Sequence, residues 1–130
     1  MTSGRGQGGA SLAGRRVLVV EDAYFIADDL RCLLEAHGAE VIGPVGQLTQ
    51  ASDLARTSEP IDAAILDIDL HGDAAYELAD VLRARGVPFV FATGYSARAI
   101  PPAYAVVPRW EKPYPYETLL AALPSLMGAR

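Results

Sequence analysis

The sequence predicts an α/β fold in which helices cover both faces of a parallel β-sheet. From residue 15 onward, short apolar runs rich in β-branched residues alternate with longer segments whose apolar residues recur at helical spacing. The apolar runs are nearly continuous, as is typical of strands that are buried on both faces. Because a helix that connects two neighbouring strands makes them parallel, this alternation indicates a sheet with right-handed crossovers and helices on either side.

The length and composition indicate one globular domain. The chain has 130 residues, of which 51% are hydrophobic and 21% are charged, an ordinary balance for a protein with a single core. The formal net charge of −5 disfavours nucleic acid as a partner, because binding to phosphates requires a basic face. No apolar run approaches the roughly 20 residues of a membrane span. We therefore expect contact with neither nucleic acid nor membrane.

The N-terminal segment and the cysteine content predict the domain limits and the compartment. Residues 1–14 are rich in glycine and serine, so we expect a disordered tail followed by one domain over residues 15–127. This segment lacks the apolar stretch of a secretory signal. A single cysteine, Cys32, excludes an internal disulfide and is typical of a reducing compartment. We expect a cytoplasmic protein in which Cys32 is a small buried helix residue.

The first half of the chain contains two strands and two helices. A strand is expected within residues 15–22, because residues 17–20 are all apolar and three of them are β-branched. Residues 23–38 show apolar side chains at helical spacing and end in a glycine, which is a common helix terminator. A short second strand within 39–46 is interrupted by a Gly-Pro pair, and residues 47–60 form a weaker helical pattern.

The second half repeats the alternation. Residues 61–69 contain a third apolar run, and residues 72–86 form an amphipathic helix that ends in glycine. Residues 87–95 contain the fourth strand, and a short fifth strand lies within 105–113. A closing helix is expected over residues 114–127, where apolar residues again recur at helical spacing.

Polar side chains follow four of the apolar runs. They are Glu21 and Asp22 after the first run, Asp67 and Asp69 at the third, Thr93 at the fourth and Lys112 at the fifth. Because the carboxyl ends of parallel strands meet at one edge of a sheet, we expect these residues to lie together. Several carboxylates in one cleft require either raised pKa values or a cation. Mg²⁺ fits such a site, since it prefers carboxylate and water oxygens.

The same residues predict phosphoryl chemistry. A carboxylate beside a metal ion can act as a nucleophile towards phosphorus, and Asp67 is the candidate. The ammonium group of Lys112 can neutralise charge on the phosphoryl oxygens, and the hydroxyl of Thr93 can donate a hydrogen bond to one of them. This role explains why a carboxylate ends a buried strand, where its desolvation is unfavourable.

Four short motifs carry a resemblance to a known family. The segments VLVVED, ILDIDL, FATGY and EKP follow one another in the order and approximate spacing of bacterial response-regulator receiver domains, the CheY-like family. The sequence resembles this family over nearly the whole expected domain. The resemblance implies a three-layer, doubly wound sandwich with a five-stranded parallel sheet in the order 2-1-3-4-5 and about five helices. The FATGY string is similar to a single-domain receiver subgroup that carries this motif.

The resemblance also implies roles for individual residues. By matching positions, Asp67 is the phosphoryl acceptor, Glu21 and Asp22 are the acidic pair that holds Mg²⁺ together with Asp67, Asp69 supplies a backbone carbonyl to the metal, and Thr93 and Lys112 are the conserved switch and lysine positions. The implied phosphoryl donor is a sensor histidine kinase or a histidine phosphotransfer protein. The implied outcome is a conformational switch that controls binding to a downstream protein target.

Two departures from the family pattern affect the expected switch. The family usually has an aromatic residue three positions before the lysine, where this chain has Arg109. We expect Tyr95, two residues after Thr93, to move in the switch instead. The stretch before Lys112 is also short and contains three prolines, which disfavour a helix interior. We therefore expect the fourth helix to be short or irregular.

The expected function is that of a stand-alone receiver. No output domain follows in the sequence, so the module would act through partner proteins as a monomer or weak homodimer. It would be no enzyme beyond slow self-phosphorylation and self-dephosphorylation.

Two alternatives stay open. The DIDLHG segment loosely resembles the Asp-x-Asp motif of haloacid-dehalogenase-type phosphatases, with Asp69 as general acid, although there the motif ends the first strand of a larger domain. A receiver-like interaction module that never accepts phosphate is disfavoured because the acceptor, the acids and the lysine are all present.

Overall fold

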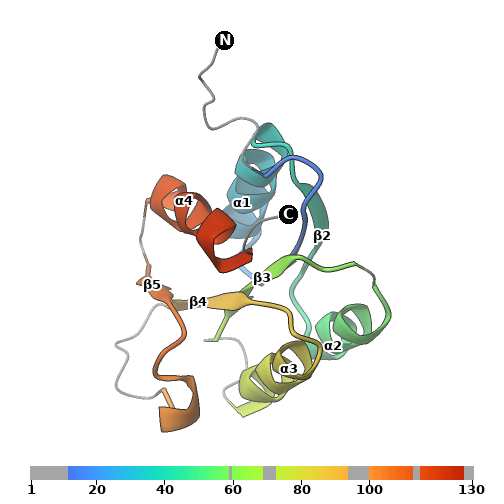
Figure 1. Cartoon of the computed structure of the whole chain (residues 1–130), viewed down its shortest axis with the longest axis vertical. Helices are drawn as coiled ribbons and strands as arrows, with labels where there is room; N and C mark the ends of the chain where they lie inside the picture. The colour runs from blue at the N-terminus through green and yellow to red at the C-terminus, as the bar shows by residue number, and fades with distance from the viewer. Residues whose placement is uncertain (1–11, 59, 69–72, 94–99, 113–114, 128–130) are drawn as a thin grey trace.

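Five parallel strands form one sheet in the order β2-β1-β3-β4-β5 (Figure 1). The computed structural model describes residues 12–58, 60–68, 73–93, 100–112 and 115–127. The strands are β1 (Arg16–Val20), β2 (Glu40–Val45), β3 (Ala63–Asp67), β4 (Phe89–Thr93) and β5 (Arg109–Glu111). All four pairings between neighbouring strands are parallel. The predicted strand order and sheet type are therefore confirmed.

Helices cover both faces of this sheet. They are α1 (Tyr24–Ala36), α2 (Leu48–Thr57), α3 (Asp73–Ala84) and α4 (Tyr116–Met127). Figure 1 shows α1 and α4 on one face and α2 and α3 on the other, which gives the expected three layers. Among the described residues there are thus four α-helices, where the sequence predicted about five. None of them is long and apolar enough to cross a membrane.

The difference in helix count lies between β4 and β5. In the described residues 100–112, this connection contains only a short 3₁₀ helix, η3 (Pro102–Tyr104). Pro101 lies at its N-terminal cap, and Pro102 is its first residue. A proline ring fixes the backbone and removes a hydrogen-bond donor, so it is tolerated at a helix start and not in its interior. The prolines therefore account for the short, irregular element.

Two apolar cores lie on the two faces of the sheet. Side chains alternate along a strand, so Val17 and Val19 of β1 enter the core under α1 and α4, while Leu18 and Val20 enter the core under α2 and α3. Every residue of β3 and β4 is buried. Burial on both faces explains why these strands are continuous apolar runs rather than alternating ones.

The domain begins earlier than the sequence predicted. Leu12, assigned to the tail, is fully buried, and its backbone N–H donates to the carbonyl of His37 at 3.2 Å. The backbone of Ala13 passes so close to Gly38 that a Cβ there would lie 2.9 Å from the Ala13 Cα. The assignment of residues 12–14 to a disordered tail was therefore wrong, because Leu12 completes the core beneath the end of α1.

Cys32 was also placed wrongly. It is exposed on α1 rather than buried. The buried positions of this helix are Ala27, Leu30 and Leu34, spaced three and four residues apart. Cys32 lies two residues from both leucines, and residues at that spacing do not share a helix face.

Candidate functional site

The predicted polar residues lie where strands reach the carboxyl edge of the sheet. Asp67 is the last residue of β3, and its neighbour Ile68 donates a backbone hydrogen bond to Ala92 of β4 at 3.1 Å. Thr93 ends β4, and its carbonyl accepts the backbone N–H of Lys112 at 2.7 Å. These backbone hydrogen bonds between neighbouring strands place Asp67, Thr93 and Lys112 at the same edge of the sheet, although the three residues are far apart in the sequence.

Lys112 joins two buried carboxylates. Its Nζ lies 3.1 Å from Asp67 Oδ2 and 2.9 Å from Glu21 Oε1. The side chains of Glu21 and Asp67 are only 1% and 3% exposed, whereas that of Lys112 is 18% exposed. The two acids are therefore almost fully desolvated and, among the described residues, both pair with Lys112, so the described groups carry more negative than positive charge in a region of low dielectric.

The pKa of Glu21 reflects this excess of buried negative charge. Burial, followed by the hydrogen bond with Asp67, raises the pKa of Glu21 to about 7, although Lys112 and the backbone N–H of Ala23 act in the opposite direction. Burial alone would lower the pKa of Lys112, but its contacts with Glu21 and Asp67 outweigh that effect and raise it. Near neutral pH the site therefore holds an ammonium group and a proton that a cation can displace.

Three carboxylates converge closely enough to hold one metal ion. Glu21, Asp22 and Asp67 each offer an oxygen, and these oxygens lie within 4.8 Å of one another. Glu21 and Asp67 are buried, and Asp22 is exposed and open to solvent. A set of hard oxygen donors with a solvent-facing side suits Mg²⁺, which retains several waters. Asp69, predicted to supply a carbonyl, lies outside the described residues.

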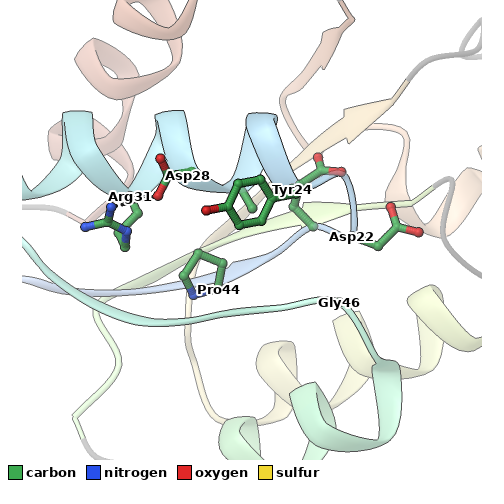
Figure 2. A pocket seen from close by; sticks show the side chains of 8 residues that line it. Asp22, Tyr24, Asp28, Arg31, Pro44 and Gly46 are labelled. Carbon is green, nitrogen blue, oxygen red and sulfur yellow. Dashed lines mark hydrogen bonds and ion pairs between the residues drawn. The ribbon is translucent and has the colours of Figure 1, made fainter.

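A cleft of about 300 Å³ opens beside Asp22, between α1 and the end of β2 (Figure 2). In Figure 2 the ring of Tyr24 lies between Asp22 at one end and Asp28 and Arg31 at the other. Arg31 pairs with Asp28 at 2.7 Å and with Glu35 at 2.8 Å, so its charge is compensated. The cleft gives a ligand access to the acidic group from the surface.

Gly46 lines the cleft next to Asp22, and it was not among the predicted site residues. A Cβ at this position would lie 3.1 Å from the Asp22 Cα. A side chain at residue 46 would therefore crowd the backbone of Asp22 and require it to shift by a few tenths of an ångström. The glycine itself was visible in the sequence, but nothing there indicated which segment it would touch.

Of the two remaining predicted switch positions, one lies in the described part of the chain and the other does not. Arg109 is exposed at the start of β5, and Tyr95 lies outside the described residues. Thr93 is 2% exposed at the edge where Asp67 and Lys112 meet. The structure thus brings together Glu21, Asp22, Asp67, Thr93 and Lys112, while Arg109 lies at the opposite end of its strand from Lys112.

Comparison with known proteins gives this geometry a family context. No family model matches the sequence. The sensory transduction protein LytT of Bacillus cereus is 36% identical over 88 residues, a match that covers 65% of this chain and 35% of LytT. The chain therefore spans about a third of the length of this curated relative.

Solved structures match a greater share of this chain than the curated relative does. A response regulator receiver protein from Sinorhizobium medicae superposes with a TM-score of 0.75 at 22% identity, covering 88% of this chain and 95% of that one. SdrG from Pseudomonas melonis, solved in its BeF3-activated conformation, is 34% identical with a TM-score of 0.73, and the match covers 89% of this chain and 98% of SdrG. This chain belongs to the response-regulator receiver family.

A third solved structure shares the fold and contains a metal ion. The receiver domain of the sensor histidine kinase PA1611 from Pseudomonas aeruginosa was solved with a magnesium ion coordinated in its active site cleft. It shares the fold at 24% identity and a TM-score of 0.71, over 90% of this receiver and all of that domain.

Proposed function

We propose that this receiver accepts a phosphoryl group on Asp67 in an Mg²⁺-dependent reaction and thereby controls the binding of a partner protein. The observation that carries the proposal is the position of Asp67, which ends a buried strand and pairs with Lys112 at 3.1 Å, while Glu21 and Asp22 offer oxygens within 4.8 Å. A carboxylate in this setting is a nucleophile with its charge-neutralising groups already in place.

The chain's own residues account for most of the proposed transfer. A carboxylate oxygen of Asp67 forms a bond to phosphorus as the bond between phosphorus and the donor's leaving atom breaks, and the leaving group departs with that electron pair. Lys112 lies where its ammonium group can neutralise a phosphoryl oxygen. Glu21 and Asp22 hold the cation. Bound Mg²⁺ would supply positive charge to the remaining phosphoryl oxygens.

Membership of the family supports a further proposal on the phosphoryl donor and the compartment. We propose a sensor histidine kinase or a histidine phosphotransfer protein as donor, in the cytoplasm, where a chain with one exposed cysteine is stable. We further propose that turnover is limited to slow self-phosphorylation and slow loss of the phosphoryl group. Asp67 and Glu21 are nearly fully buried, which limits the access of water to the acyl phosphate.

A finer proposal concerns the subgroup and the switch. The FATGY segment at residues 91–95 and the arginine at position 109 support membership of a subgroup in which the usual aromatic is absent. We propose that Tyr95 takes over the movement that follows phosphorylation. If Tyr95→Ala shows the same beryllofluoride-induced spectral changes as the wild type, this role is excluded.

We also propose that the domain acts without a covalently attached output domain. Support comes from SdrG, 98% of whose chain is matched by this receiver. Immunoblotting of the source cells should then show a species near 13.8 kDa. A larger species would contradict this part of the proposal.

Intact-mass measurement tests the central claim. Wild-type protein incubated with acetyl phosphate and Mg²⁺ should gain one phosphate mass, and the adduct should be absent without Mg²⁺ or in Asp67→Asn. Asp53→Asn, which neutralises an exposed acid on α2, serves as the matched control and should be labelled normally. If Asp67→Asn is labelled as well as the wild type, the acceptor assignment is wrong. Labelling of Asp69→Asn separates a receiver from a phosphatase, which would need that general acid.

A further inference from the structure

A second concave surface lies at the opposite end of the sheet from the acidic site. This groove has a volume of about 430 Å³ and is formed by the α3–β4 connection, the segment before β5 and the end of α4. The residues that line it are Arg83, Gly86, Val87, Pro88, Phe89, Val106, Val107, Pro108, Leu126 and Met127. Its volume lies in the range of roughly 300–1,000 Å³ that is usual for ligand sites.

Arg83 is the one charged residue among those lining residues. Its guanidinium lies over the ring of Tyr104, 4.7 Å from the centroid, and donates to the carbonyl of Ala103 at 3.2 Å. Within the described parts of the chain, no carboxylate forms an ion pair with it. By contrast Arg31, on the other side of the molecule, pairs with two acids. The groove therefore offers an uncompensated cation beside an apolar wall.

Contacts of Tyr104 hold the apolar wall of the groove in a defined position. It is 6% exposed, and its ring stacks on Tyr76 with centroids 5.2 Å apart. Its hydroxyl donates to the carboxylate of Asp80 and contacts the carbonyl of Tyr76 at 3.2 Å. Val107 then bonds back to the Tyr104 carbonyl at 3.0 Å. The cation and the wall are therefore held before any ligand arrives, which lowers the entropic cost of binding.

The rim of the groove is also apolar. Val106 is 89% exposed and is one of three large hydrophobic side chains that the described residues leave exposed. The other two, Tyr24 and Phe25, lie at the start of α1. An exposed apolar side chain beside a preformed groove is characteristic of interaction surfaces, whereas an isolated one is common and uninformative.

We propose that this groove docks an extended peptide segment of a partner protein in which apolar side chains flank a carboxylate. The carboxylate would pair with Arg83, and the apolar side chains would cover Val106, Val107 and Met127. Charge complementarity favours this occupant, because Arg83, which has no ion-pair partner among the described residues, is the one charged residue in the described lining. Nucleic acid and anionic membrane are disfavoured by the net charge of −5. The proposal is independent of phosphorylation at Asp67.

Peptide titration followed by NMR tests the proposal. The probe is acetyl-Leu-Phe-Glu-Leu-Phe-amide, in which apolar side chains flank one glutamate, and the matched neutral probe replaces that glutamate by glutamine. We expect shift changes confined to Val87, Val106, Val107 and Met127, with affinity for the acidic probe at least tenfold higher. Arg83→Met should remove that preference. Arg56→Met, which removes an exposed arginine from α2, should keep it.

A second variant keeps the test informative if Arg83→Met does not fold. Val106→Asp changes an exposed side chain, so it should fold normally while weakening binding of both probes. The proposal is overturned if neither probe shifts the groove resonances at millimolar concentration, if a probe with lysine in place of the glutamate binds as well as the acidic one, or if sedimentation shows a dimer that Val106→Asp dissociates.

Discussion

The carboxyl and amino ends of the β-sheet differ in the kind of side chains that are buried there. At the carboxyl end, Glu21 and Asp67 are nearly fully buried and share a single cation, Lys112. At the amino end, Leu12 fills the core beneath α1, and nine of the ten residues that line the groove carry no charge. The first end is built around charge in a low-dielectric region, and the second around apolar contact.

This difference indicates which end of the sheet serves ligand binding and which end contributes to stability. Buried like charges destabilise a fold unless a cation neutralises them, so the carboxyl end retains an arrangement that is favourable only when a ligand binds. In the described residues of the amino end, acids pair with arginines, as in Arg15–Asp62 and Arg16–Glu40, and the core there contributes apolar burial. Between pH 6 and pH 8, the stability of the carboxyl end should therefore depend on metal and pH, whereas that of the amino end should not.

Removal of Lys112 should have the largest effect. Lys112→Met leaves two buried carboxylates without their cation, and breaking a buried ion pair typically costs about 3–5 kcal/mol. We expect the free energy of unfolding in urea, without metal at pH 8, to fall by about that amount, with partial recovery in Mg²⁺. The double variant Glu21→Gln/Lys112→Met serves as the control and should lose less. Equal losses in the single and double variants would show that charge repulsion is not the cause.

Truncation of Leu12 should destabilise the other end through packing. Leu12→Ala creates a cavity at a fully buried site, for which about 3 kcal/mol is typical. Urea unfolding should show this loss equally at pH 6 and pH 8, with or without Mg²⁺. Deletion of residues 1–11 is the control and should leave stability within about 0.5 kcal/mol. A loss that depends on Mg²⁺ would break the proposed division between the two ends.

Magnesium binding should weaken as pH falls through neutrality. The pKa of Glu21 is raised to about 7, so at pH 6 about a tenth of this group is ionised and at pH 8 about nine tenths. The apparent Mg²⁺ affinity, measured by the metal-induced rise in Tm, should therefore drop about tenfold from pH 8 to pH 6. For the metal-free fold the sign is opposite: the contribution of Glu21 to stability is present below its ordinary pKa of 4.5 and is lost as pH rises through about 7.

Glu21→Gln provides the control for this pH dependence. It removes the titrating group while keeping a polar side chain of similar size. The difference in Mg²⁺ affinity between pH 6 and pH 8 should then largely disappear. If it persists, another group controls the binding.

The smallest expected effect concerns the wall of the groove. Tyr104→Phe removes the hydroxyl that bonds to Asp80 and keeps the ring that stacks on Tyr76. We expect a loss of about 1.5 kcal/mol at pH 7, at the lower end of the range for hydrogen bonds to charged groups. Burial, then the bond to Asp80, raises the pKa of Tyr104 to about 12, so its contribution is present below pH 10 and is lost as pH rises towards 12. Wild type and variant should therefore converge in alkaline urea unfolding, and a constant difference would contradict this assignment.

Much of the fold was predictable because local patterns and topology agree. Continuous apolar runs identified β1, β3 and β4, since only strands buried on both faces show them. The polar residues that follow these runs then had to share one sheet edge, and the structure places Glu21, Asp67 and Lys112 in contact. Their roles in phosphoryl transfer remain predictions.

The errors arose where local composition gave the wrong signal. Leu12 lies in a glycine- and serine-rich stretch that is typical of disorder, yet one apolar side chain is enough to fix the chain against the end of α1. Cys32 belongs to a residue type that is often buried, but its position on the helix decided otherwise. In both cases a long-range contact or a helix face overrode composition.

The sequence by itself determined the sheet type and the edge at which the acidic residues meet, because strand periodicity and parallel crossovers leave few alternatives. Tertiary structure alone decided three other features. These are the close approach of Gly46 to Asp22, the shift of the Glu21 pKa to about 7, and the groove in which Arg83 has no described acidic partner. Each depends on atoms from segments distant in the sequence, and their separations are set only when the two cores pack against the sheet.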